Sequence, residues 1–134
     1  MGEPNLSPVD GHAHRGGKAG TALVLGLTFK ENVPDLRNSR SADVIARLEE
    51  LGHRISVADP YADADEVRAE FGREPEAIDG RAFDLVVGAV KHDQYRQLGP
   101  DRLAALVAPG GTLADIKAMW QRAAMPAGLD YWTL

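Results

Sequence analysis

The chain of 134 residues contains no cysteine, which excludes disulfides, thiolate metal sites and cysteine nucleophiles. It also has no basic excess, because its formal net charge is −5 and no run of lysines or arginines occurs. We therefore expect no nucleic-acid or acidic-membrane surface, so a local group of cations must bind any phosphate. No apolar run approaches the roughly 20 residues that span a bilayer, and no signal peptide opens the chain. A cytoplasmic protein is the expectation.

The first 20 residues differ in composition from the rest of the chain. They have almost no apolar periodicity and many residues that break regular structure. These are Pro4, Pro8, Gly11, Gly16, Gly17 and Gly20. We interpret residues 1–20 as a flexible lead-in or linker. Residues 21–134 have the composition of a globular protein and suffice for one domain with a proper core.

Strand and helix patterns alternate from Thr21 to the end of the chain. The expected strands cover residues 22–25, 54–58, 83–90, 112–116 and 131–134, and the expected helices cover residues 41–51, 63–71 and 99–108. A turn is expected at residues 109–111. This alternation predicts an α/β fold, a Rossmann-like three-layer α/β/α sandwich with a mostly parallel sheet.

A polar, irregular loop joins the first expected strand to the first expected helix. It contains Lys30 and Arg37 and ends beside a helix N-terminus, which favours anions through its free N–H groups and its dipole. In open α/β sheets, ligands bind outside the carboxyl ends of the strands, where such loops gather. The loop is therefore predicted to bind an anion.

Two later loops should meet the first one at the same edge of the sheet. One carries Lys91 and His92, and the other carries Asp115 and Lys117. Together with Lys30 and Arg37, Lys91 and Lys117 could hold a diphosphate, with the arginine suited to bidentate contact, although each lysine could instead be merely solvated. His92 could be a general base, but without a visible nucleophile or acid partner we favour an anchor of its loop.

A complete dinucleotide site is the competing interpretation. It requires G-x-G-x-x-G after the first strand and an acidic residue about 20 residues further on. Only Gly26 is present, and Asp59 comes too late and is followed by Pro60. The fold alone therefore does not assign NAD to this domain.

The stretch GLTFKENVPDLRNSRSADVI, residues 26–45, carries a family resemblance. It is similar to the opening of the C-terminal, UDP-binding domain of the UDP-glucose/GDP-mannose dehydrogenase family, and looks closest to the UDP-N-acetylhexosamine dehydrogenase branch. The resemblance continues in the expected order through residues 58–61, 89–93, 109–111 and 115–117. Five ordered blocks at family spacing are far more specific than one short motif.

The resemblance implies a role for four residues. Phe29 and Lys30 would contact the nucleotide sugar, Lys117 would lie near this substrate, and Arg37 would reach NAD bound mainly by a separate N-terminal domain. Enzymes of the family oxidise a sugar C6 alcohol to a uronic acid through a thioester on a cysteine. Because this chain has no cysteine, we expect no catalytic residue in it and no activity of the chain alone.

Two functions stay open from the sequence. The first is the UDP-sugar-binding domain of an NAD-dependent nucleotide-sugar 6-dehydrogenase of polysaccharide biosynthesis, acting on UDP-N-acetylhexosamine or UDP-glucose. Its partners would be the UDP-sugar and the N-terminal and central domains missing here, and the full-length enzyme would be a homo-oligomer. The alternative is a stand-alone nucleotide-binding or interaction module without catalysis.

Overall fold

A computed structural model of the chain describes residues 20–36, 39–121, 125 and 129–133. The expected lead-in, residues 1–20, lies outside this part except for Gly20. The candidate cofactor contact Arg37 also lies outside the described residues. Within the described ranges, no helix is long and apolar enough to cross a membrane.

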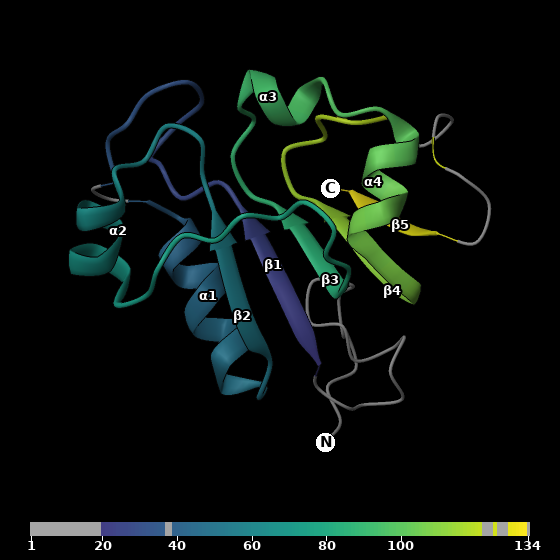
Figure 1. The fold of residues 1–134 in the computed structure, drawn as a ribbon, viewed down its shortest axis with the longest axis horizontal. Helices are drawn as coiled ribbons and strands as arrows, with labels where there is room; N and C mark the ends of the chain where they lie inside the picture. The colour runs from purple at the N-terminus through teal and green to yellow at the C-terminus, as the bar shows by residue number, and fades with distance from the viewer. Residues whose placement is uncertain (1–19, 37–38, 122–124, 126–128, 134) are drawn as a thin grey trace.

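Five parallel strands form one sheet in the order β2-β1-β3-β4-β5 (Figure 1). The strands are β1 (Thr21–Leu25), β2 (Arg54–Ala58), β3 (Phe83–Gly88), β4 (Val107–Asp115) and β5 (Asp130–Thr133). Leu25 is paired with Ala58 on one side and with Gly88 on the other, and Gly88 is paired with Asp115. The carboxyl ends of four strands therefore lie in one row, and the loops that follow them start at one edge of the sheet.

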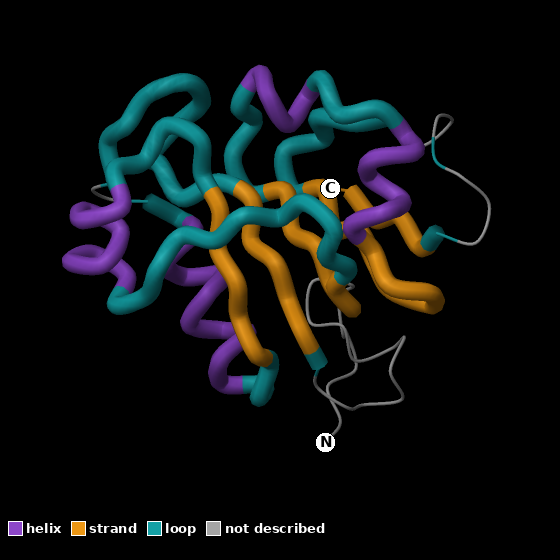
Figure 2. Tube along the Cα trace, viewed as in Figure 1, coloured by secondary structure: helices purple, strands orange, loops and turns teal. Residues whose placement is uncertain are grey.

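Helices cover both faces of this sheet (Figure 2). They are α1 (Ser41–Glu50), α2 (Ala64–Phe71), the short α3 (Asp93–Arg96) and α4 (Pro100–Leu106). Ile45 and Leu48 of α1 are buried against one face, and Leu103 and Leu106 of α4 are buried against the other. The predicted three-layer α/β/α fold is confirmed, with a sheet that is parallel throughout.

Two predicted boundaries are wrong around β4. The expected helix over residues 99–108 ends at Leu106, and the strand expected from Thr112 begins at Val107. Phe83 pairs with Val107, whereas Leu85 pairs with Thr112, so several residues of β4 bulge out between two consecutive pairs. The expected turn at residues 109–111 is this bulge inside the strand, with Gly110 at a φ of 80°.

The strand β3 ends at Gly88 rather than at Val90, as expected from its apolar run. The N–H groups of Ala89 and Val90 both reach the carbonyl of Leu25, so the chain leaves the regular ladder there. Gly26, which follows Leu25, has a φ of 104°, and a Cβ on it would lie 2.5 Å from the Cβ of Val90. A glycine is therefore required where the loops after β1 and β3 part.

Candidate functional site

The loops after β1 and β3 part at the centre of the sheet. The first leads to α1 on one face, and the second leads to α3 and α4 on the other. Neighbouring strands whose loops diverge in this way form the crevice where open α/β sheets bind ligands. A cavity of about 60 Å³ lies there, which we call the switch-point cavity. It is lined by Thr28, Phe29, Lys30, Glu31, Arg40, Ser41, Ala89, Val90 and Lys117.

Three cations from three segments line the switch-point cavity. Lys30 comes from the loop after β1, Arg40 directly precedes α1, and Lys117 comes from the loop after β4. None of the three makes an ion pair or a side-chain hydrogen bond with any residue in the described part of the chain. By contrast, Arg68 forms an ion pair with Glu74. Glu31 adds one carboxylate to the same lining, but the three cations outnumber it, so the cavity is net positive and favours an anion.

The structure brings together the three residues predicted to contact a substrate. Phe29, Lys30 and Lys117 all line the switch-point cavity. Phe29 is 53% exposed, which is unusual for a large apolar side chain in this protein. Lys91 is exposed but does not line the cavity, so the expected group of three lysines is incomplete. Arg40 is the third cation instead.

The buried carboxylate of Asp59 shapes the loop after β1. Its Oδ2 accepts the N–H groups of Leu27 at 2.6 Å and Thr28 at 3.2 Å, and its Oδ1 accepts the N–H of Tyr61 at 2.8 Å. Burial by itself would raise the pKa of Asp59. Hydrogen bonds from His92, Leu27 and Tyr61 outweigh that effect and hold the pKa below its ordinary value. The carboxylate is therefore ionised and fixes the start of the loop.

His92 connects this carboxylate to the far side of the same loop. Its ring is fully buried, with Nε2 2.9 Å from Oδ2 of Asp59 and Nδ1 2.9 Å from the backbone nitrogen of Asn32. Since Nδ1 accepts the Asn32 N–H, the ring hydrogen sits on Nε2 and is donated to Asp59. Both ring nitrogens are occupied, which confirms the anchor interpretation and argues against a general base.

Asp115 shapes the loop that carries Lys117. Its Oδ1 accepts the N–H of Met119 at 2.9 Å, and its Oδ2 accepts the N–H of Trp120 at 2.9 Å and the hydroxyl of Tyr131 at 2.5 Å. The side chain is fully buried. Asp115 therefore helps to position the loop of Lys117 and does not face a ligand.

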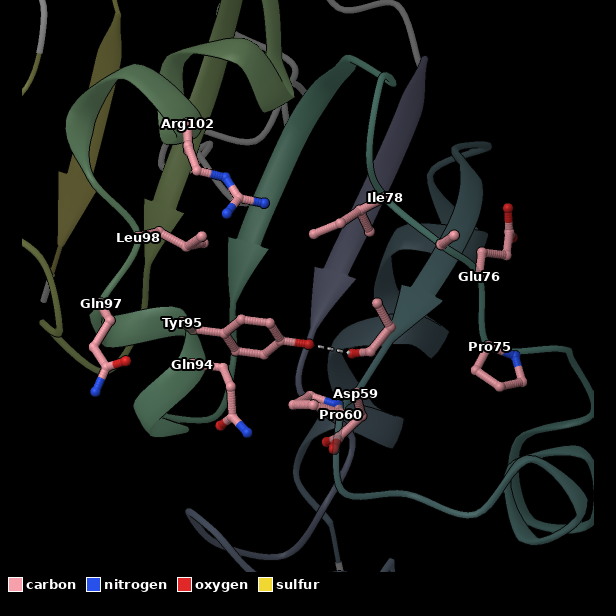
Figure 3. A pocket seen from close by; sticks show the side chains of 12 residues that line it. Asp59, Pro60, Pro75, Glu76, Ile78, Gln94, Tyr95, Gln97, Leu98 and Arg102 are labelled. Atoms are coloured by element: carbon pink, nitrogen blue, oxygen red, sulfur yellow. Dashed lines mark hydrogen bonds between the residues drawn. The ribbon is translucent and has the colours of Figure 1, made fainter.

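A larger hollow of about 580 Å³ lies over the sheet beside α3 (Figure 3). Ile78, Leu98 and the ring of Tyr95 form much of its wall, and the Tyr95 hydroxyl donates to the carbonyl of Ala58 at 3.0 Å. Its cation Arg102 is already within 3.4 Å of a carboxylate oxygen of Asp79. The hollow therefore lacks the unpaired cations of the switch-point cavity and fits an anion less well.

Burial, and then the negative charge of Asp59, raise the pKa of Tyr95. Its hydroxyl is therefore protonated and available as the donor to Ala58. Tyr95 thereby ties α3 to the carboxyl end of β2.

A sequence model of the UDP-glucose/GDP-mannose dehydrogenase family, UDP binding domain, matches residues 23–122. The chain is 37% identical over 98 residues to the UDP-N-acetyl-D-glucosamine 6-dehydrogenase of Salmonella typhi, which covers 72% of this chain and 23% of that protein. It is 37% identical over 117 residues to Protein CapL of Staphylococcus aureus, which covers 85% of this chain and 27% of that protein.

Among solved structures, a UDP-D-ManNAc dehydrogenase from Pyrococcus horikoshii has the same fold. Its TM-score is 0.70 at 16% sequence identity, and the match covers 92% of this chain and 28% of that one. The chain thus spans about a quarter of the length of the relatives it matches.

Proposed function

The chain belongs to the UDP-glucose/GDP-mannose dehydrogenase family, as its UDP binding domain, and we propose that its switch-point cavity binds the diphosphate of a UDP-sugar. The observation that carries this proposal is the meeting of Lys30, Arg40 and Lys117, none of them paired with a described residue, in a chain whose net charge is −5. The family resemblance read from the sequence is confirmed.

Each residue of the site has a distinct chemical part in this proposal. Lys30 and Lys117 supply point charges for the phosphoryl oxygens, and Arg40 offers a planar group for bidentate contact. The exposed ring of Phe29 offers a surface on which the uracil base can stack. The exposure of Phe29 then has a function, because a ligand would cover it.

The activity of the whole enzyme is a wider proposal. The relatives' names support a full-length protein that oxidises the C6 alcohol of a UDP-sugar, and the sugar itself stays open. The described residues do not fit an NAD site, since a long polar loop and not a tight glycine-rich turn follows β1. NAD would therefore be bound mainly by the N-terminal domain, and the contact of Arg37 with it stays a prediction. Homo-oligomer formation and a cytoplasmic location also stay predictions.

The stand-alone nucleotide-binding or interaction module left open by the sequence is the weaker interpretation. The relatives include a 6-dehydrogenase in which the matching segment makes up 23% of the protein. A segment of this kind works with other domains, which would supply the catalytic cysteine that this chain lacks.

Calorimetric titration of UDP at low ionic strength tests the proposal. Lys30→Ala and Lys117→Ala should each weaken UDP binding by about ten-fold or more, as expected for the loss of a charge-assisted hydrogen bond. Lys91→Ala is the matched control, because it removes an exposed lysine that does not line the cavity. Millimolar ligand is needed, since the domain holds only part of the full site. Failure of the wild type to bind UDP, or an equal loss in Lys91→Ala, would refute the proposal.

A further inference from the structure

The buried side chain of His92 holds the tip of the loop after β1 in place on both sides of the tip. The tip, residues 29–31, contains Lys30 and lies between Thr28 and Asn32. Nδ1 of His92 accepts the N–H of Asn32 at 2.9 Å. Nε2 of His92 donates to Oδ2 of Asp59 at 2.9 Å, and the same oxygen accepts the N–H of Thr28 at 3.2 Å. His92 comes from a different loop, after β3, and its side chain is fully buried. The tip is thus held from outside its own segment.

Further hydrogen bonds close the tip between these two points. The hydroxyl of Thr28 donates to the carbonyl of Lys30 at 2.9 Å. The side-chain oxygen of Asn32 accepts the N–H of Asp93, the neighbour of His92, at 3.0 Å. Asn32 has a φ of 62°, a left-handed conformation that asparagine tolerates better than most residues. The two loops are therefore tied in both directions at Asn32.

The position of this tip matters because Lys30 has no partner of its own in the described part of the chain. A lysine side chain without a partner samples many rotamers. The position of the tip backbone therefore sets the region that its ammonium can reach, and so whether that region includes the switch-point cavity. A site that is already in place loses less free energy to ordering when the ligand binds.

We infer that His92 is a positioning residue for the ligand: by holding Asn32 directly and Thr28 through Asp59, it keeps Lys30 over the switch-point cavity. The inference rests on the proposed function, because it concerns affinity for a phosphate-bearing ligand at that site. His92 itself touches no ligand, since its side chain is fully buried.

A histidine that only stabilises the fold would behave differently on substitution. The folded fraction would decrease, but the affinity of the folded protein would be unchanged. His53 provides the matched control, because it is also buried, at 5% exposure, and its Nδ1 accepts the N–H of Gly20 at 3.2 Å. It directly precedes β2, at the opposite end of the sheet from the switch-point cavity.

Two substitutions separate the two contacts of His92. His92→Asn places its side-chain oxygen near the former Nδ1, so it can still accept the Asn32 N–H but loses the contact with Asp59. His92→Gln reaches further and can donate to Asp59, but offers no acceptor at the former Nδ1 position. The three variants, His53→Asn included, are compared with the wild type where thermal unfolding shows all of them to be folded.

UDP affinity by calorimetry is the first measurement. His92→Gln should bind UDP about five-fold more weakly than the wild type, the factor that one net hydrogen bond corresponds to. His92→Asn should recover much of this loss, and His53→Asn should bind like the wild type. Wild-type affinity in both His92 variants, or a larger loss in His92→Asn than in His92→Gln, would overturn the inference.

Hydrogen exchange of the ligand-free chain is the second measurement. The amides of Phe29 and Asn32 are hydrogen-bonded, and both should exchange faster in His92→Gln than in the wild type and His53→Asn. If the wild type does not bind UDP but this difference in exchange is found, the proposed function is refuted, while the role of His92 in holding the tip is supported. Unchanged exchange at both amides would show that His92 does not hold the tip, whichever ligand the site binds.

Discussion

The hydroxyl of Tyr131 lies 2.5 Å from Oδ2 of Asp115, so the last strand of the sheet is bonded to the carboxylate that shapes the loop of Lys117. Tyr131 is in β5 and Asp115 ends β4, and both side chains are buried. The same carboxylate accepts two backbone N–H groups from residues 119 and 120. A hydrogen bond between β5 and β4 thus helps to position Lys117 beside the switch-point cavity.

Tyr131→Phe should destabilise the domain by about 2 kcal/mol, because a buried carboxylate loses a hydrogen-bond donor. Unfolding in urea, followed by circular dichroism, measures the change in the free energy of unfolding. Tyr61→Phe is the control, since the side chain of Tyr61 is only partly buried and its hydroxyl has no partner among the described residues. Equal stability losses in the two variants would show that the Asp115 contact contributes nothing.

Asp59 should make the stability of the domain depend on pH at the acidic end. Because the folded state holds the pKa of Asp59 below its ordinary value, the carboxylate stabilises the fold at pH values above the range in which carboxyl groups ordinarily titrate. This contribution is lost as the pH falls through the lowered pKa. Asp59→Asn should therefore cost about 3 kcal/mol near neutral pH, and the difference from the wild type should shrink below about pH 4.

Urea unfolding of both proteins across this pH range gives the difference directly. Asp79→Asn is the control, because the Asp79 side chain is 85% exposed and should show only a small difference at every pH. A gap between wild type and Asp59→Asn that widens towards low pH would contradict the assignment of Asp59 as an ionised anchor.

Local sequence signals predicted most of the fold. The helix expected at residues 41–51 is α1, the strand at 54–58 is β2, and the helix at 63–71 is α2 with Asp63 as its N-cap. The side chain of Asp63 accepts the N–H of Glu66, and Gly72 ends the helix in the left-handed conformation. Helix α3 escaped prediction because four residues are too few for a periodic pattern.

The site was only partly predictable for a different reason. Phe29, Lys30 and Lys117 could be identified because the family resemblance covers them, and the structure places them around one cavity. Arg40 was missed, although it directly precedes a correctly predicted helix. In a sequence, a single arginine cannot be distinguished from one that is merely solvated at the surface. The contacts of Asp59 with Leu27 and His92 join residues more than 30 positions apart, which no local pattern reveals.

Phe29 and Lys30 should affect different parts of the ligand. Phe29→Ala should weaken UDP binding by about 1–3 kcal/mol through lost stacking, yet leave the binding of inorganic pyrophosphate unchanged. Lys30→Ala should weaken the binding of both ligands, because the proposed contact of its charge is with the diphosphate. Competition titrations with UDP and pyrophosphate measure the two effects. Equal weakening of pyrophosphate binding in Phe29→Ala would show that the ring supports the loop and not the base.

Nuclear magnetic resonance mapping of the UDP-binding surface tests the central claim most directly. The ¹⁵N-labelled chain is titrated with UDP, and the amide shifts around the switch-point cavity are compared with those around the larger hollow beside α3. We predict the largest shifts at Phe29, Lys30, Ser41 and Lys117, and little change at Ile78, Leu98 and Arg102. Saturable shifts confined to the larger hollow, with the amides around the switch-point cavity unmoved, would contradict the account.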